Sequence, residues 1–164
     1  MEIGTAYGGT LFCFCKLAKG DAIIISMDLP EGSYGTGYPG YPEWKVPIYQ
    51  AFTKQNQKLF LLRKDSHQQE SLEEVKKLLN GNQLDFLFID GDHSYEGVKK
   101  DFEMYSPLVR RGGVIAFHDI VRHIDYLEVE VWRFWQEIKD NYPYKEFIKN
   151  RKQGWAGIGV LYNL

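Results

Sequence analysis

The chain has 164 residues, of which 44% are hydrophobic and 26% charged, so its length fits one domain with a buried core. Its formal net charge of −2 excludes a strong field that would recruit nucleic acid or anionic lipid. No apolar run approaches the roughly 20 residues that span a bilayer, and no secretory signal is visible at the N-terminus. We therefore expect one domain over residues 1–164 of a cytoplasmic protein, without a nucleic-acid or membrane partner. Cys13 and Cys15 are expected to be reduced, because their spacing on a helix points them apart.

Short β-branched runs alternate with helical patterns along the chain, as they do in α/β folds. The run over 84–89 lacks polar alternation, which is typical of a strand buried on both faces. Strands are predicted at a very short stretch ending near residue 3 and at 22–27, 58–62, 84–89, 113–117, 144–148 and 157–162. Because the first strand is so short, we expect this domain to lack upstream residues, including N-terminal helices.

Helical patterns fill the intervals between these strands. The first covers residues 8–18, and the second, over 47–55, begins with a proline, which suits a first helical turn. Ser71 and Glu74 form a capping-box pattern for the third helix, which the pair Asn80-Gly81 ends. Apolar stripes mark two later helices: Val98, Phe102 and Tyr105, and then Leu127, Val131, Phe134, Trp135 and Ile138.

The segment from residue 30 to residue 47 is crowded with glycine, tyrosine and proline and cannot form regular structure. It is too short and too aromatic for a disordered linker, so we interpret it as an ordered loop or lid after the second strand. Its aromatic rings can cover a sugar ring, and the alternatives are a packed flap and an oligomer contact. The rings concerned are Tyr34, Tyr38, Tyr41 and Trp44.

The stretch EIGTAYGG, residues 2–9, follows the first strand and opens a helix. Glycines at such a point let the backbone turn tightly and approach a ligand. The spacing from Gly4 to Gly8 differs from the dinucleotide pattern G-x-G-x-x-G and suits a nucleoside-type ligand that lacks a pyrophosphate. Taken alone, the stretch is also compatible with a plain strand-to-helix turn.

Polar residues at the ends of the next two strands face the same predicted crevice. Asp28 ends the second strand, where a carboxylate can accept hydrogen bonds from both hydroxyls of a ribose. The segment 64–67 follows the third strand, where small polar groups can hold an adenine edge. The alternatives are a solvated aspartate at Asp28 and a capped turn at Asp65 and Ser66.

Acidic and imidazole groups follow two further strands. Asp90, Asp92 and His93 lie within four residues after one buried strand, and the next strand leads into His118 and Asp119. Because adjacent parallel strands lie about 4.8 Å apart, their carboxyl ends can share one ion. We therefore predict a metal site at Asp90, His118 and Asp119 with open positions for substrate. The alternative is that these charges simply face water.

Three stretches resemble class I S-adenosylmethionine-dependent methyltransferases: EIGTAYGG, LDFLFIDGDHSYEGVKKDFEMYSPLVRRGG and VIAFHDI. More narrowly, they are similar to the group that includes cephalosporin-hydroxylase-like proteins and metal-dependent sugar O-methyltransferases. The resemblance covers nearly the whole chain. It implies a Rossmann-like, doubly wound, mostly parallel sheet with an antiparallel strand near one edge.

The resemblance also implies a site for S-adenosylmethionine. Gly4, Tyr7 and Gly8 match the loop around the methionine part of the cofactor, Asp28 matches the ribose acid, and residues 65–66 match the adenine-side turn. The full set of cofactor-binding residues predicted here is Glu2, Gly4, Tyr7, Gly8, Asp28, Asp65, Ser66 and Asp90.

Asp90 matches the first metal carboxylate of these enzymes, and Asp92 matches the position proposed as general base in the sugar-modifying members. His118 and Asp119 fall where the family usually has an acid pair or Asp-Asn. The imidazole of His118 departs from that pattern, and one imidazole with two carboxylates suits Mn²⁺ or Fe²⁺ as well as Mg²⁺. Alternatively, His118 shuttles a proton without binding metal.

These residues predict an in-line transfer of the sulfonium methyl group to a hydroxyl of a small-molecule or sugar acceptor. A divalent metal, Mg²⁺ or Mn²⁺, would lower the pKa of that hydroxyl, and the catalytic base would be Asp92 or His93. A vicinal diol can chelate the ion through two oxygens. The sequence leaves a homo-oligomer open.

Two other functions compete with this interpretation. An iron oxygenase would use His93, His118 and one carboxylate as a facial triad. The glycine loop and Asp28 argue against it, because an oxygenase needs no nucleoside pocket. A binding module would hold the cofactor or a nucleoside without catalysis.

Overall fold

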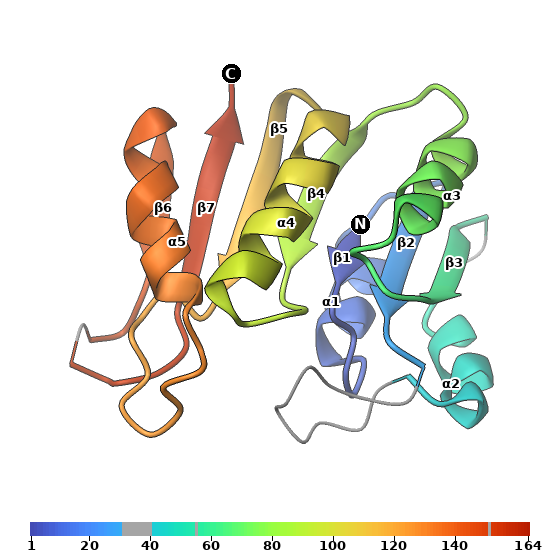
Figure 1. The fold of residues 1–164 in the computed structure, drawn as a ribbon. Helices are drawn as coiled ribbons and strands as arrows, with labels where there is room; N and C mark the ends of the chain where they lie inside the picture. The colour runs from blue at the N-terminus through green and yellow to red at the C-terminus, as the bar shows by residue number, and fades with distance from the viewer. Residues whose placement is uncertain (31–40, 55, 151) are drawn as a thin grey trace.

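The computed structural model describes residues 1–30, 41–54, 56–150 and 152–164. Within these residues one sheet of seven strands has the order β3-β2-β1-β4-β5-β7-β6 (Figure 1). Its strands are β1 (Glu2–Ile3), β2 (Ile23–Asp28), β3 (Lys58–Arg63), β4 (Leu84–Ile89), β5 (Val109–His118), β6 (Tyr144–Phe147) and β7 (Ile158–Asn163). The first five strands pair in parallel, while β7 pairs antiparallel with both β5 and β6. The predicted fold, with its antiparallel strand near one edge, is confirmed.

Helices cover both faces of the sheet, as a doubly wound fold requires. They are α1 (Gly9–Leu17), α2 (Val46–Gln50), α3 (Gln69–Leu79), α4 (Tyr95–Tyr105) and α5 (Val131–Ile138). Figure 1 shows α3, α4 and α5 on the near face, where they bury the larger apolar cluster. A second cluster combines buried residues of α1 and α2 with Ile24 and Leu59 of the sheet. No helix in the described part of the chain combines the length and apolar character needed to cross a bilayer.

Two helix starts differ from the sequence-based expectation. The third helix begins at Gln69, so Ser71 lies inside it and its hydroxyl donates to the carbonyl of Asp65 at 2.7 Å instead of capping the helix. The last helix begins at Val131, and Leu127 is 72% exposed in the preceding loop. The spacing of Leu127 therefore matches the apolar stripe of α5 only by coincidence. The predicted end of the third helix at Asn80 is confirmed, because Asn80 has the left-handed conformation with φ 49°.

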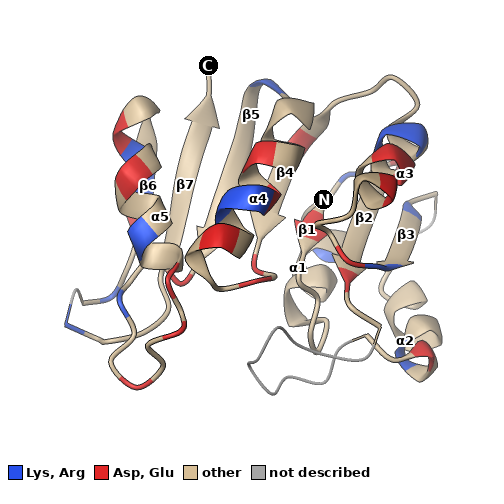
Figure 2. Ribbon diagram, viewed as in Figure 1, with Lys and Arg blue, Asp and Glu red and all other residues tan. Residues whose placement is uncertain are grey.

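The order of the strands places a switch point beside β1. The chain leaves β1 toward β2 on one side and later returns to β4 on the other. The loops after β1 and β4 therefore diverge, and ligands of open α/β sheets bind in the crevice at such a point, outside the carboxyl ends of the strands. In Figure 2, acidic residues mark the carboxyl ends of β2 and β4 at this edge.

A buried polar group lies inside the sheet just before this edge. Glu2 of β1 is the register partner of Ser26 of β2, whose hydroxyl donates to the Glu2 carboxylate at 2.9 Å. The hydroxyls of Ser26 and Thr5 lie 2.5 Å apart. Burial raises the pKa of Glu2 to about 7, although these hydroxyl contacts partly oppose the shift.

The tight contact between β7 and α5 predicts an effect of one added methyl group. A Cβ at Gly159 would lie 2.7 Å from the indole ring of Trp135, which is fully buried. Gly159→Ala should therefore cost about 1–3 kcal/mol of unfolding free energy by overpacking. Gly9→Ala is the matched control, because nothing lies within 4 Å of its added Cβ. Urea unfolding measures both, and equal midpoints for the two variants would contradict this packing.

The buried carboxyl of Glu2 predicts a pH dependence of stability. Its pKa rises from 4.5 in the unfolded chain to about 7 in the folded one, so the folded state holds a proton between these values that the unfolded state loses. Stability should therefore fall as pH rises from 4.5 to 7, by about 3 kcal/mol at most. Glu2→Gln removes this titration. The unfolding free energy of the variant, relative to that of the parent, should therefore increase as pH rises from 4.5 to 7. Urea titrations at several pH values measure the difference, and parallel pH curves would contradict it.

Candidate functional site

The glycine loop, residues 4–8, connects β1 to α1 at the switch point. Gly4 has φ +88°, and a Cβ there would lie 2.0 Å from the carbonyl oxygen of Asp90. Gly8 has φ +77°, and its Cβ would lie 2.5 Å from the ring of Tyr49. Both glycines are therefore required by backbone conformation and by close packing. The loop passes directly against the end of β4.

Asp28, at the end of β2, holds this loop in place. Its Oδ2 accepts hydrogen bonds from the backbone N–H groups of Thr5 at 2.9 Å and Ala6 at 2.8 Å. Its Oδ1 accepts from the N–H of Leu29 at 2.8 Å. The structure thus brings Asp28 and the glycine loop together, as the sequence predicts, and adds a role in shaping the loop.

Residues after position 40 hold the same loop from the other side. The carbonyl of Ala6 accepts hydrogen bonds from the buried ammonium of Lys45 at 3.0 Å and from the hydroxyl of Tyr49 at 2.8 Å. The ammonium of Lys45 also lies 5.0 Å from the ring centre of Tyr7. The sequence analysis missed Lys45, although a lone cation in the aromatic stretch YPEWKVPIY was a usable signal.

The aromatic rings predicted to cover an acceptor have different positions. Tyr41 is buried in the second apolar cluster, with its ring centre 5.3 Å from that of Tyr49, so it is a core residue. Trp44 is exposed. Tyr34 and Tyr38 lie outside the described residues.

The turn after β3 is a capped turn, the alternative considered for Asp65 and Ser66. The carboxylate of Asp65 accepts hydrogen bonds from the N–H of His67 and the side chain of Gln68, each at 2.8 Å. Ser66 is buried, and its carbonyl accepts a hydrogen bond from Tyr105 at 2.8 Å. This fixed turn lies at the carboxyl end of β3, on the same edge as the glycine loop.

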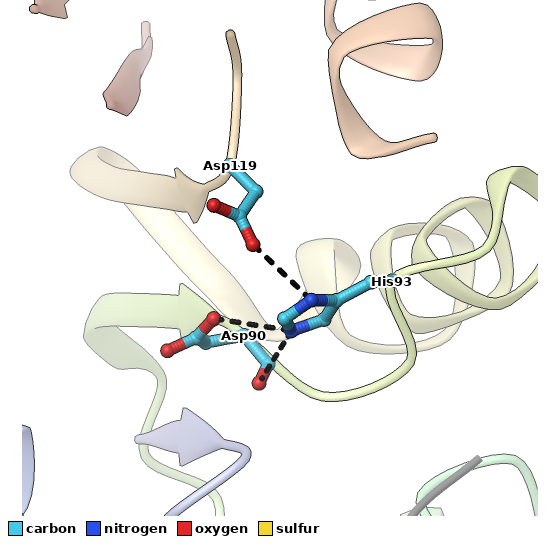
Figure 3. A group of neighbouring side chains, drawn as sticks. All are labelled: Asp90, His93 and Asp119. Carbon is cyan, nitrogen blue, oxygen red and sulfur yellow. Dashed lines mark hydrogen bonds and ion pairs between the residues drawn. The ribbon is translucent and has the colours of Figure 1, made fainter. Parts of the chain in front are cut away.

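Asp90, His93 and Asp119 converge after β4 and β5 (Figure 3). The imidazole of His93 lies between the two carboxylates, with Nε2 3.4 Å from Asp90 Oδ1 and Nδ1 3.1 Å from Asp119 Oδ2. One ligand atom from each residue falls within 4.8 Å of the others. Donors around a divalent ion with bonds of about 2.0–2.6 Å have such separations. The geometry therefore fits a metal ion.

Two more imidazoles surround Asp119. Nδ1 of His118 lies 3.3 Å from Asp90 Oδ1 and 3.2 Å from Asp119 Oδ1. Nε2 of His123 lies 2.9 Å from Asp119 Oδ1. His118 thus lies beside both predicted metal carboxylates, but the group whose ligand atoms could share an ion contains His93 in its place. The sequence analysis missed His123, for which the signal was a histidine four residues after a strand-end acid.

The charges of this cluster shift each other's protonation. Burial lowers the pKa of His93 and His118, but Asp119 and Asp90 outweigh it and raise both pKa values to about 10. Burial raises the pKa of Asp119, but His118 and His93 outweigh it and hold that pKa well below its usual range. The pKa of Asp90 is lowered for the same reasons. In the absence of metal, imidazolium groups therefore neutralise the carboxylates.

Asp92 has a different environment from its neighbours. Its Oδ1 accepts a hydrogen bond from the N–H of Ser94 at 2.9 Å. Its carboxyl group packs against Gly97 of α4, where an added Cβ would lie 2.1 Å from Asp92 Cγ. The side chain of Asp92 thus packs on α4, whereas that of His93 points between Asp90 and Asp119.

Comparisons with known proteins identify the family and the fold of this chain. A family model described as a methyltransferase domain matches residues 1–120. The chain is 31% identical over 175 residues to the uncharacterized protein y4gI of Sinorhizobium fredii, in an alignment that covers 99% of this chain and 17% of that protein. The chain therefore spans about a sixth of the length of this relative.

Two solved structures share the fold. One is an O-methyltransferase from Bacillus cereus in complex with S-adenosylhomocysteine (SAH), with TM-score 0.60 and 19% identity, covering 98% of this chain and 72% of that one. The other is the methyltransferase MycE of the mycinamycin biosynthetic pathway in complex with Mg, SAH and mycinamycin VI. Its TM-score is 0.50 at 11% identity, covering 95% of this chain and 48% of that one. With the family model matching residues 1–120 of 164, the chain belongs to the methyltransferase domain family.

Proposed function

We propose that this chain binds S-adenosylmethionine at the switch point and transfers its methyl group to a hydroxyl of a small-molecule or sugar acceptor, with the help of a divalent metal. The observation that carries this proposal is the contact between Gly4 and the carbonyl of Asp90. It joins the candidate cofactor loop to the candidate metal cluster, so a methyl donor and an activated hydroxyl would meet at one edge of the sheet. Such positioning is the main contribution of an enzyme to a displacement reaction.

The cofactor part of the proposal rests on the glycine loop and Asp28; Glu2, also predicted to bind the cofactor, is buried inside the sheet against Ser26. Oδ1 of Asp28 accepts one backbone hydrogen bond and keeps a lone pair that can accept from a ribose hydroxyl, whereas Oδ2 is occupied by the N–H groups of Thr5 and Ala6. The O-methyltransferase from Bacillus cereus and MycE, which share this fold, both contain SAH. The capped turn of Asp65 and Ser66 is our candidate for the adenine side.

Asp90, His93 and Asp119 would hold the metal. Their mixture of two carboxylates and one imidazole suits Mn²⁺ and also admits Mg²⁺, which MycE contains. When bound, such an ion favours the ionised form of a nearby hydroxyl. Asp92 and His93 are the sequence-based candidates for the base, and because His93 would hold the metal, Asp92 is the one we keep. His118, which lies against both carboxylates, is the alternative where a bound ion displaces its proton.

The oxygenase alternative loses its support, because the chain belongs to a methyltransferase family. A module that binds the cofactor without catalysis stays the second candidate, and methyl transfer separates it from an enzyme. A cytoplasmic location and a homo-oligomer stay predictions from the sequence.

Cofactor binding is tested by calorimetry with SAH and the intact protein. Asp28→Ala removes a carboxylate that shapes the loop and would accept from the ribose, so it should weaken binding by about 1–3 kcal/mol. Asp85→Ala is the control, because this aspartate is an exposed acid in β4 whose partner is Arg110. The parent protein failing to bind SAH would overturn the assignment of the cofactor.

Metal dependence is tested in two steps. EDTA should abolish methyl transfer and leave SAH binding intact, and Mn²⁺ or Mg²⁺ should restore the transfer. Asp90→Asn should reproduce the effect of EDTA and lose Mn²⁺ binding in electron paramagnetic resonance, because it removes one of two charged ligands. Asp92→Asn is the matched control and should bind Mn²⁺ like the parent.

The turnover of Asp92→Asn then decides which group accepts the proton. A loss of roughly 10²–10⁴-fold would identify Asp92 as the base, and near-parental turnover would favour His118. Full activity of the parent in EDTA would exclude the metal mechanism.

A further inference from the structure

The loop between β6 and β7 carries an exposed indole, and its backbone is bonded to the segment that follows Asp119. Trp155 is 62% exposed, whereas Trp135 is fully buried in the core. The loop after Asp119 adds Ile124, Tyr126 and Leu127, which are also exposed. A single exposed apolar residue is ordinary, but several of them on two loops that touch each other form a candidate binding surface.

The backbone on both sides of Trp155 is hydrogen-bonded to the segment that follows Asp119. The carbonyl of Ala156 accepts a hydrogen bond from the N–H of Val121 at 3.0 Å, and the carbonyl of Gly154 accepts one from the N–H of Ile124 at 3.1 Å. A Cβ at Gly154 would lie 3.0 Å from the side chain of Ile124, so the two loops are in contact. The residues on both sides of Trp155 are thus attached to the segment that follows Asp119.

His123 connects the same loop to the metal cluster. The N–H of Ala156 donates to Nε2 of His123 at 3.2 Å, and this nitrogen lies 2.9 Å from Asp119 Oδ1. Ala156 has φ 57° and Asp119 has φ 59°, which non-glycine residues rarely adopt. Such strain persists where the surroundings enforce it, as it does at ligand sites. The backbone next to Trp155 is therefore tied to Asp119 through His123.

Resting on the function proposed above, we propose that Trp155 binds the methyl acceptor and selects acceptors whose hydroxyl is carried by a ring. The flat indole offers a stacking face for a sugar or aromatic ring, while Asp90 and Asp119 lie where the hydroxyl must be ionised. Ile124 and Tyr126 extend this surface along the neighbouring loop. Trp155 is thus a specificity-determining residue, and the chemistry itself takes place at the cluster.

The test compares methyl transfer to catechol and to methyl glucopyranoside, with S-adenosylmethionine and Mn²⁺ present. For whichever of the two diols is methylated, Trp155→Ala should increase KM roughly 3–10-fold, the equivalent of one lost stacking contact. The same variant should change kcat by less than about threefold. Trp155→Phe should recover most of the affinity because it keeps an aromatic face. Tyr144→Ala is the control, since Tyr144 is an exposed aromatic residue at the other end of β6.

The readouts separate this inference from the function on which it rests. Calorimetry measures SAH binding, and electron paramagnetic resonance measures Mn²⁺ binding. Trp155→Ala should leave both affinities unchanged. An unchanged KM in Trp155→Ala overturns the role of Trp155. The inference is also overturned if the parent binds SAH and Mn²⁺ but methylates neither diol, while circular dichroism confirms that each variant is folded.

Discussion

The close approach of Gly4 to the Asp90 carbonyl is the contact on which the arrangement of the site depends. β1 is only two residues long, yet it is hydrogen-bonded between β2 and β4, and the N–H of Asp90 donates to the carbonyl of Ile3 at 2.8 Å. A side chain at position 4 would separate these strand ends, since its Cβ would lie 2.0 Å from the Asp90 oxygen. The close approach therefore brings the glycine loop, residues 4–8, next to the loop that begins with Asp90.

Electrostatic balance is the second constraint at this edge. Asp90 and Asp119 would repel each other in a partly buried site without a positive group between them. Imidazolium groups provide that charge in the free protein, and a divalent ion can replace it, because metal binding to histidine displaces a proton. The side chain of Asp92 packs against Gly97 of α4 instead. The two acids of the sequence DGDH, Asp90 and Asp92, therefore have different surroundings.

The order of strand-end residues was predictable, but contacts between loops were not. The buried strand before Asp90 and the strand before Asp119 follow from apolar runs, and parallel pairing brings their ends together. His123 and Trp155 lie in loops, and Lys45 lies in a short 3-10 turn, whose paths no periodicity encodes. Leu127 illustrates the same limit, because its spacing fits α5 while the chain around it forms a loop. The preference for His93 over His118 depends on side-chain direction, which strand positions do not fix.

The insertion of β7 between β5 and β6 has a consequence for how the protein is made. β7 is formed by residues 158–163, so the outer edge of β5, residues 109–118, has no partner until the chain beyond residue 157 has been synthesised. An unpaired edge of this kind invites association with other chains, and pairings distant in sequence form slowly. The loop that carries Ala156 reaches His123 only at this late stage. A nascent chain that stops before β7 would therefore expose an unpaired, aggregation-prone edge of β5 and would lack the contact between Ala156 and His123.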